Sequence, residues 1–395
     1  FTIPLMKSIG YDAEFAGAVE ATASTGGAIM PPVMGASAFL MAEFVGVKYW
    51  DVVVAAFIPA LMYYLAVLFQ VDLYALKNGL HGEARENLPS LKKTIRGIWK
   101  LSPIVLLIIL IGPVGFTVQK CGILTVTYTI LLSFVSKDTR FNKERIKAFI
   151  SDAAHGCLTV AIATAAAGII IGTVTGTGLS VRLSSVLVKL AGGNFAVLLI
   201  LTMLASLLLG MGLPSAACYL LLASLVAPTM VKLGAPIMAA HLFVLYFGVI
   251  SNVTPPVAMA AYAGAGIAKC NPVKCGVKAF KLAIGGFLLP FFFVYNDVLL
   301  MNGSGLEVAQ AAVMATIGIY CIACALEGYI WTAPIDIFAR VAMAAAGLLT
   351  IHPATFTDLI GIAIIVAVHL LYNAKFRKSG GRKAATARVS GTQKQ

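Results

Sequence analysis

The chain has 395 residues, of which 60% are hydrophobic and 11% charged, and its formal net charge is +13. A soluble domain carries about 25% charged residues, so this composition excludes an ordinary soluble protein. The Lys and Arg residues flank apolar segments and do not alternate with aromatic residues, which argues against a nucleic-acid partner. The apolar runs lack the alternation of barrel strands, so we predict an all-α polytopic membrane protein that lies in a lipid bilayer.

Residues 1–50 are predicted to contain the end of an element that begins upstream, residues 1–10, and a first discontinuous helix, residues 13–45. Its middle reads Ser24-Thr25-Gly26-Gly27-Ala28-Ile29-Met30-Pro31-Pro32. Two glycines loosen the backbone there and two prolines remove N–H donors, so a continuous helix is excluded. Irregular backbone at membrane depth is tolerated where it is buried or lines a cavity. This break is therefore a candidate binding site.

Residues 51–148 are predicted to form membrane spans joined by cytoplasmic basic loops. The spans are expected at 52–76, 101–118 and 121–136. The loops are expected at 77–100 and 137–147, and they carry Lys77, Arg85, Lys92, Lys93, Arg96, Lys100, Lys137, Arg140, Lys143, Arg145 and Lys147.

Residues 149–300 open with a predicted span at 149–172 and an amphipathic segment at 180–192 that suits a membrane interface. At 194–230, two apolar arms flank Gly210-Met211-Gly212-Leu213-Pro214-Ser215. Each arm is shorter than the roughly 20 residues that a spanning helix needs, which favours a re-entrant hairpin. A second discontinuous helix is predicted at 237–268, interrupted at Ser251-Asn252-Val253-Thr254-Pro255-Pro256. A basic loop, 269–281, and a span, 283–300, follow.

Residues 301–372 are predicted to add spans at 308–327, 337–351 and 356–372. Residues 373–395 are basic and rich in Gly, Ser and Ala, so a disordered tail is expected. Cys321 and Cys324 have a metal-like spacing but no second pair, so we interpret them as small core residues.

The two Pro-Pro pairs indicate a diverged internal repeat. They lie 224 residues apart, and at the same offset Pro4 matches Pro228, Gly10 matches Gly234 and Val33 matches Val257. If residues 77–100 are cytoplasmic, the C-terminus is also cytoplasmic and the two copies have opposite orientation. All but five of the 29 Lys and Arg residues then lie on the cytoplasmic side; the five are Lys48, Lys120, Arg182, Lys189 and Lys232.

The two breaks and the hairpin tip, in this order and spacing, resemble the large membrane permease subunit of TRAP (tripartite ATP-independent periplasmic) transporters, and are most similar to fused permeases of the TAXI type. The resemblance covers roughly residues 1–300. It implies an inverted-repeat elevator-type transporter in the bacterial inner membrane, driven by a sodium gradient. It also implies two partners, a periplasmic TAXI-type solute-binding protein and a small four-helix membrane subunit or its fused N-terminal equivalent. Most of the first hairpin would then lie upstream of Phe1.

The breaks and this resemblance together suggest the site residues. Sodium needs several oxygen ligands, which carbonyls and hydroxyls at helix breaks can supply. One ion is placed at the first break, and a second between the hairpin tip and the second break. The proposed ion ligands are Ser24, Thr25, Gly26 and Met30, then Gly210, Gly212, Ser215, Ser251 and Thr254. A small organic acid would bind near Gly27, Pro32, Asn252 and Pro256, where helix N-termini after the prolines favour an anion. No cofactor besides sodium is expected.

Other functions remain open. A proton-coupled carrier would use Glu20, one turn before Ser24, because carboxylates at membrane depth are costly and often functional. Glu20 could equally lie near the cytoplasmic surface. An intramembrane enzyme is disfavoured, because we find no nucleophile with its base and no metal-binding motif. A channel or structural subunit would not need the paired helix breaks. His155 and His241 are interpreted as hydrogen-bonded packing residues.

Overall fold

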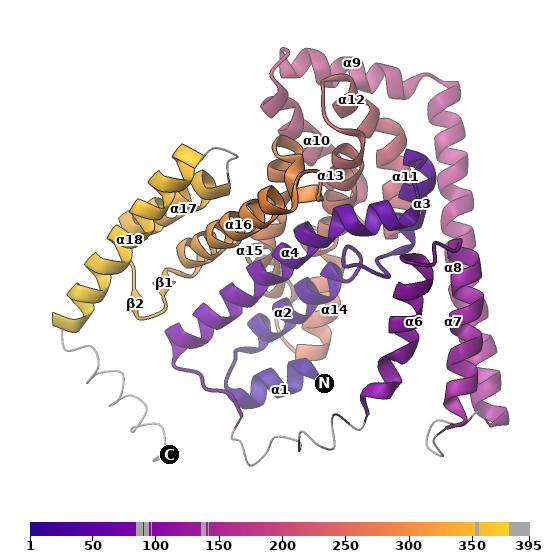
Figure 1. Ribbon diagram of the computed structural model, residues 1–395, viewed down its shortest axis with the longest axis horizontal. Helices are drawn as coiled ribbons and strands as arrows, with labels where there is room; N and C mark the ends of the chain where they lie inside the picture. The colour runs from indigo at the N-terminus through magenta and orange to yellow at the C-terminus, as the bar shows by residue number, and fades with distance from the viewer. Residues whose placement is uncertain are drawn as a thin grey trace.

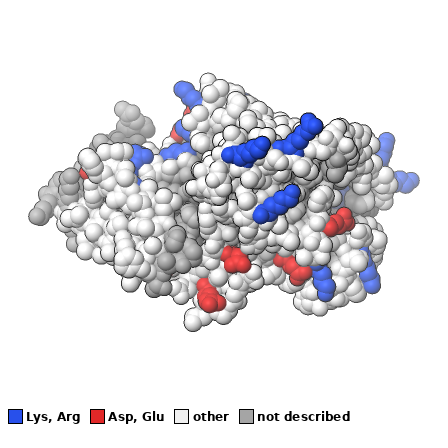
Figure 2. Space-filling model, turned by 90° about the horizontal axis from the view of Figure 1, so that it is seen from above, with Lys and Arg blue, Asp and Glu red and all other residues white. Residues whose placement is uncertain are grey.

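The computed structural model describes residues 1–83, 90, 95, 97–135, 140, 142–351 and 355–378, and within this part it is almost entirely helical. Five of its helices are long and apolar enough to cross a membrane. On the face drawn in Figure 2, most of the surface is uncharged, and the Lys, Arg, Asp and Glu residues lie in small groups on it. The prediction of an all-α polytopic membrane protein is confirmed.

The first discontinuous helix consists of α2 (Ala13–Gly26) and α3 (Ala36–Val45), which follow α1 (Thr2–Ile9). Asp12 caps α2 by accepting a hydrogen bond from the Phe15 N–H. The break between the two halves contains Pro31 and Pro32. The chain then continues into α4 (Tyr49–Asn78), the longest of the five candidate spans, which extends past both ends of the predicted span.

One flank of the molecule contains α6 (Ser102–Ile111), which η2 (Ile98–Leu101) precedes, α7 (Val118–Ser133) and α8 (Lys143–Gly176); α9 (Leu179–Ala191) then crosses the top of the view in Figure 1. Helix α6 is shorter than the span predicted at 101–118, and α7 begins and ends three residues before the span predicted at 121–136. Helix α8 begins at Lys143, so Lys143, Arg145 and Lys147 are helical and do not form the predicted loop. Arg85, Lys92, Lys93, Arg96 and Lys137 of the two predicted basic loops lie outside the described residues.

The second copy begins with a helical hairpin of α10 (Phe195–Gly210) and α11 (Ser215–Leu225), continued by α12 (Ala227–Lys232). The discontinuous helix α13 (Ile237–Ile250) and α14 (Met259–Ala268) follows, with the one-turn η3 (Ser251–Val253) at its break. Helix α15 (Pro272–Tyr295) comes next. The predicted basic loop at 269–281 is wrong, because Asn271 caps α15 and Pro272 starts it, which makes Lys274, Lys278 and Lys281 helical.

The two discontinuous helices lie antiparallel at the centre of the fold (Figure 1). Helix α2 packs against α14 and α15, and α3 packs against α13. The order broken helix followed by long helix is the same in both copies, α2–α3–α4 and α13–α14–α15. Both copies bury their apolar side chains in one core cluster that includes Tyr63, Tyr246 and Phe247. The two broken helices therefore run in opposite directions, which is the arrangement that an inverted repeat requires.

A C-terminal extension lies on the flank opposite α8 (Figure 1). It contains α16 (Gly305–Glu327), the short antiparallel pair β1 (Tyr329–Ile330) and β2 (Ala333–Pro334), α17 (Ile337–Ile351) and α18 (Thr355–Lys378), and η4 (Asp297–Leu300) leads into it. Helix α16 packs on α4. Helix α18 continues to Lys378, so residues 373–378 are not the predicted disordered tail; residues 379–395 lie outside the described residues.

Candidate functional site

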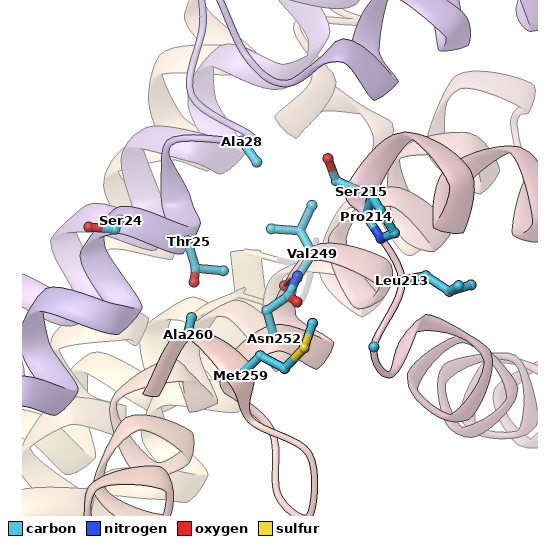
Figure 3. A pocket seen from close by; sticks show the side chains of 11 residues that line it. Ser24, Thr25, Ala28, Leu213, Pro214, Ser215, Val249, Asn252, Met259 and Ala260 are labelled. Carbon is cyan, nitrogen blue, oxygen red and sulfur yellow. Dashed lines mark hydrogen bonds between the residues drawn. The ribbon is translucent and has the colours of Figure 1, made fainter. Parts of the chain in front are cut away.

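A pocket of about 440 Å³ opens where the first break, the second break and the hairpin tip meet (Figure 3). Three elements far apart in the sequence supply its walls: the end of α2, the start of α11 and the turn from α13 into α14. The lining residues are Ser24, Thr25, Ala28, Gly212, Leu213, Pro214, Ser215, Val249, Asn252, Met259 and Ala260.

Five of the predicted site residues line this pocket. They are Ser24 and Thr25 from the first break, Gly212 and Ser215 from the hairpin tip, and Asn252 from the second break. The structure thus brings together residues of both predicted ion sites and one of the predicted substrate-binding residues.

The hydroxyl groups at the two breaks donate to nearby oxygens. Ser24 donates to Glu20 Oε1 at 3.2 Å and Thr25 donates to the Ala21 carbonyl at 2.8 Å. In the second break, the buried Ser251 and Thr254 hydroxyls donate to the carbonyls of Gly248 (2.7 Å) and Ile250 (2.8 Å). Each hydroxyl uses its one hydrogen in these bonds, and its oxygen keeps two lone pairs with which it could ligate a cation.

The carbonyl groups of the first break are less free than the sequence suggested. The carbonyls of Ser24, Thr25 and Gly26 accept the N–H groups of Gly27, Ala28 and Ile29, and the Met30 carbonyl accepts that of Met34 at 3.1 Å. A carbonyl oxygen has two lone pairs, so each could still contribute one to an ion. Met30 is not among the residues that line the pocket.

Several predicted residues have close packing contacts. A Cβ atom on Gly26 would lie 2.6 Å from the Tyr63 ring, and one on Gly210 would lie 2.9 Å from the Ser251 hydroxyl. A side chain at either position would force its neighbour to move. The Gly210 contact joins the hairpin tip to the second break, where the second ion site was predicted.

The remaining predicted substrate residues lie beside the pocket and do not line it. Gly27 is exposed, and its N–H donates to the Ser24 carbonyl at 3.0 Å. The Pro32 carbonyl accepts the Tyr49 hydroxyl at 2.9 Å, and the Pro256 carbonyl accepts the Tyr262 hydroxyl at 2.6 Å. Each tyrosine hydroxyl therefore occupies one lone pair of a proline carbonyl within a helix break.

Sequence reasoning missed the apolar part of the pocket. Ala28, Leu213, Pro214, Val249, Met259 and Ala260 carry no chemical group that marks a site. Pro214, Met259 and Ala260 could have been found from their position, because each lies at the start of a helix that follows a predicted break. The start of α14 was predicted to face an anion, and Met259 and Ala260 at this start line the pocket. The start of α11 also lines the pocket, although no anion was predicted there.

The other candidate residues have simpler environments. His241 is buried and its Nδ1 lies 2.7 Å from the Tyr219 hydroxyl, which confirms a hydrogen-bonded packing residue. His155 is also hydrogen-bonded, to the Ser151 carbonyl at 2.7 Å, and it is exposed on α8, so it is not part of the buried core. Cys321 and Cys324 are buried free thiols. Within the described ranges no three His, Cys, Asp or Glu side chains are grouped to hold a metal ion.

Glu20 lies one turn below the pocket. Its carboxylate accepts hydrogen bonds from Ser24 and from the Thr2 hydroxyl, and its side chain is half-buried. Glu20 is the one acidic side chain for which a role was predicted. Its contact with Ser24 connects it to a residue that lines the pocket.

Comparison with known proteins gives one family. A search among curated proteins finds no match. Residues 1–308 match the family model described as "Tripartite ATP-independent periplasmic transporter, DctM component". This match spans both discontinuous helices, the hairpin and every pocket residue, and it ends within α16. The chain therefore belongs to the DctM family, the family of a membrane component of tripartite ATP-independent periplasmic transporters.

Proposed function

We propose that this chain moves a small organic acid across the bacterial inner membrane, using the energy of a sodium gradient. The observation that supports this most directly is the pocket, because it lies between two antiparallel broken helices and a hairpin tip. Binding sites at the interface of inverted repeats, built from discontinuous helices, are typical of secondary transporters. An elevator movement of the pocket-bearing helices would expose the site to each side in turn.

Sodium coupling is supported by the chemistry of the two breaks. Thr25, Ser251 and Thr254 place hydroxyl oxygens next to backbone carbonyl oxygens near helix ends, and Ser24 places its hydroxyl next to the Glu20 carboxylate. Oxygen is the ligand atom that hard cations prefer, and C-terminal helix ends carry partial negative charge. The α2 and α13 ends therefore offer two places for a small cation.

We further propose that a periplasmic TAXI-type solute-binding protein delivers the substrate, and that a small four-helix membrane subunit or its fused equivalent completes the transporter. The name of the family, a tripartite transporter, supports two further components. The TAXI subtype and the fused architecture follow from the sequence resemblance alone.

A cytoplasmic C-terminus is supported by the grouping of basic residues at one end of the long helices. Lys77, near the end of α4, and Lys281, in the first part of α15, both contact Glu327. The two helices run in opposite directions, so their basic ends lie on one side of the molecule. Basic residues at one membrane face mark the cytoplasmic side.

Uptake into proteoliposomes tests the proposal. The full-length transporter would be reconstituted with its cognate binding protein, and labelled carboxylates would be supplied with an imposed sodium or proton gradient. We expect uptake that requires both the sodium gradient and the binding protein, and that is lost in a Ser251→Ala, Thr254→Ala double variant. Uptake that is indifferent to sodium would contradict the sodium sites.

A proton-coupled carrier is the second candidate, favoured by the hydrogen bond between Glu20 and Ser24. If Glu20 relays a proton, Glu20→Gln abolishes uptake driven by a pH gradient, because the amide cannot exchange a proton. If sodium is the coupling ion, Glu20→Gln retains sodium-dependent uptake with a modest change in sodium affinity. Measuring uptake of this variant under each gradient in turn separates the two mechanisms.

A further inference from the structure

The helix bounds repeat at the same spacing as the two Pro-Pro pairs. Adding 224 to the bounds of α2, 13 and 26, gives 237 and 250, which are the bounds of α13. In the same way Tyr49, the first residue of α4, corresponds to Val273, the second residue of α15. Each position at the first break therefore has a counterpart at the second break, and the two can be compared.

The first break is held by hydroxyl groups of α4, which packs beside α2 (Figure 1). Tyr63 donates to the Thr22 carbonyl at 2.8 Å, and Tyr64 donates to the Ala23 carbonyl at 3.0 Å. These two carbonyls directly precede Ser24, which lines the pocket. The last turn of α2 is thereby fixed by groups that belong to another helix.

The ring of Tyr63 is closely packed. It is 1% exposed, and it lies between two glycines, since a Cβ on Gly26 of α2 or on Gly286 of α15 would lie 2.6 Å from it. Tyr64 packs edge-on against this ring, with ring centroids 5.7 Å apart. Because packed rings move only with their neighbours, the Tyr63 hydroxyl can leave the Thr22 carbonyl only if α2, α4 and α15 separate.

The second break is held by side chains of its own segment. Ser251, Asn252 and Thr254 each donate to a backbone carbonyl three or four residues earlier in the chain. A rotation about the Cα–Cβ bond of one of these residues frees a carbonyl without moving another helix. The carbonyl oxygen and the side-chain oxygen can then both ligate a cation.

The two breaks therefore differ at matching positions. Tyr63 and Tyr64 correspond to Phe287 and Leu288 of α15, which carry no hydroxyl group. The three polar side chains of the second break have counterparts without a side-chain donor, namely Gly27, Ala28 and Met30. The first break is thus fixed from outside, and the second break is fixed from within.

We propose that Tyr63 and Tyr64 are positioning residues that hold the first break in one shape, and that the second break is the one that changes shape when cations bind. The first break then presents Ser24 and Thr25 to the pocket in the same arrangement with and without a cation (Figure 3). This inference rests on the proposed function, because it states how the two breaks respond to the cations proposed for them.

Hydrogen exchange of the backbone amides tests the hold of the tyrosines. The double variant Tyr63→Phe, Tyr64→Phe keeps both rings and removes only the hydroxyls. We expect the amides of residues 27–29 to exchange about tenfold faster than in the unmodified full-length protein, because each lost hydrogen bond lowers the free energy of local opening. Exchange would be followed by mass spectrometry in detergent. Tyr64→Phe alone should show part of the effect, and it serves if the double variant does not fold.

Tyr74→Phe is the matched control. Tyr74 also lies on α4 and donates to α2, but its partner is Asp12, at the opposite end of α2 from the break. Its loss should weaken the contact between the two helices and leave exchange at the break unchanged.

Sodium dependence of uptake gives a second measurement on the same variants. In proteoliposomes, the double variant of Tyr63 and Tyr64 should need about tenfold more sodium for half-maximal uptake at an unchanged maximal rate, since a loosened first break must be ordered again when its cation binds. Tyr74→Phe should need as much sodium as the unmodified protein.

The response of each break to sodium tests the second half of the proposal. In the unmodified protein, sodium should slow amide exchange at residues 251–254 and leave exchange at residues 27–29 unchanged. Choline at the same concentration replaces sodium in the reference sample, so that ionic strength is constant.

The outcomes separate this inference from the proposed function. Equal exchange at the first break in the double variant and in the unmodified protein would overturn the hold of the tyrosines. Slowing of both breaks by sodium, or of the first alone, would overturn the division between them. Absence of a sodium effect on exchange and on uptake alike would overturn the proposed function, whereas faster exchange in the double variant would still support the hold of the tyrosines.

Discussion

Asp12 connects three helices at one end of the fold. It caps α2, accepts hydrogen bonds from Tyr74 on α4 and Lys278 on α15, and forms an ion pair with Lys278, which also lies 3.8 Å from Glu14. Partial burial by itself would raise the pKa of Asp12. The hydrogen bonds from Lys278, Tyr74 and the Phe15 N–H, together with the Lys278 charge, outweigh it and lower the pKa below its usual range.

Replacing Asp12 should separate its capping role from its charge. Asp12→Ala should lower the free energy of unfolding by about 1 kcal/mol through loss of the cap, and somewhat more through loss of the Lys278 pair. Asp12→Asn keeps a capping oxygen and should cost less. Thermal unfolding of the purified protein in detergent, compared with the unmodified protein, measures both.

The pH dependence of the Asn variant has a definite sign. Because folding lowers the pKa of Asp12, its charge stabilises the folded state above the unfolded pKa, and this contribution is lost as the pH falls through the folded pKa. The difference between Asp12→Asn and the unmodified protein should therefore be present at pH 7 and shrink below about pH 4. A difference that stays constant over this range would show that the charge of Asp12 does not stabilise the fold.

At the scale of elements, the two copies meet through glycines. A Cβ on Gly264 of α14 would lie 2.6 Å from the Gly17 carbonyl of α2, and one on Gly17 would lie 3.1 Å from the Cys275 sulfur. Small residues allow helix backbones to approach closely, which is how many membrane helices associate. This contact holds the first broken helix against the second and fixes the distance across which the pocket forms.

Gly264→Ala should push α2 and α14 apart. The backbone carbonyl it meets cannot move aside as a side chain could, so we expect a loss of about 1–3 kcal/mol in stability and weaker substrate binding. Gly266, on the same helix, has nothing within 4 Å of its Cβ position. Gly266→Ala should therefore be neutral or slightly stabilising, because alanine favours a helix. Equal effects of the two substitutions on the melting temperature would rule out the close contact as their cause.

The helix breaks could be predicted from the sequence because their cause is local. Paired prolines and glycines interrupt a helix in any surroundings, and the two breaks and the hairpin tip lie where those residues predict. The start of α15 was missed, since three lysines suggested a loop although Asn271 and Pro272 form a helix start. Lys278 on this helix pairs with Asp12 and Glu14, which are more than 250 residues away in the sequence, and Lys281 pairs with Glu327 at the end of α16.

The candidate site was predicted less completely than the fold. Polar residues at the breaks were found, but the apolar lining was not. Aliphatic residues occur both in a protein core and in the wall of a pocket, so their presence in the sequence does not distinguish the two. Whether a carbonyl at a break already accepts a hydrogen bond also depends on residues that are distant in the sequence. Tyr49, for example, donates to the carbonyls of Pro32 and Val33 from the start of another helix.

At the scale of the whole molecule, the C-terminal extension is attached to both copies through one buried residue. Glu327, at the end of α16, is 2% exposed. Its Oε1 lies 2.7 Å from Lys281 Nζ on α15, and its backbone carbonyl accepts Lys77 Nζ on α4 at 2.8 Å. The family match ends at residue 308, so Glu327 lies beyond the matched residues while its partners Lys77 and Lys281 lie within them. Glu327 therefore joins the extension to α4 and α15, the long helices that follow the two breaks.

Glu327→Gln should weaken this attachment. It removes the countercharge of Lys281 in a buried position, which is costly, although the lysine side chain is 39% exposed and can reach water. We expect a loss of about 1–3 kcal/mol, less than for a fully buried pair. Lys274→Ala, an exposed lysine earlier on α15, serves as the matched control and should change stability little.

A double-mutant cycle of Glu327→Ala with Lys281→Ala isolates the pair itself, because it removes the other contacts of each residue from the comparison. If the ion pair holds the extension, the double variant should be less destabilised than the sum of the two single variants, and limited proteolysis after residue 327 should be faster in both singles. Additive effects would mean that α16 is held by its apolar contacts with α4 alone. The extension would then depend on packing with the first copy, and the lysine of the second copy would be incidental to it.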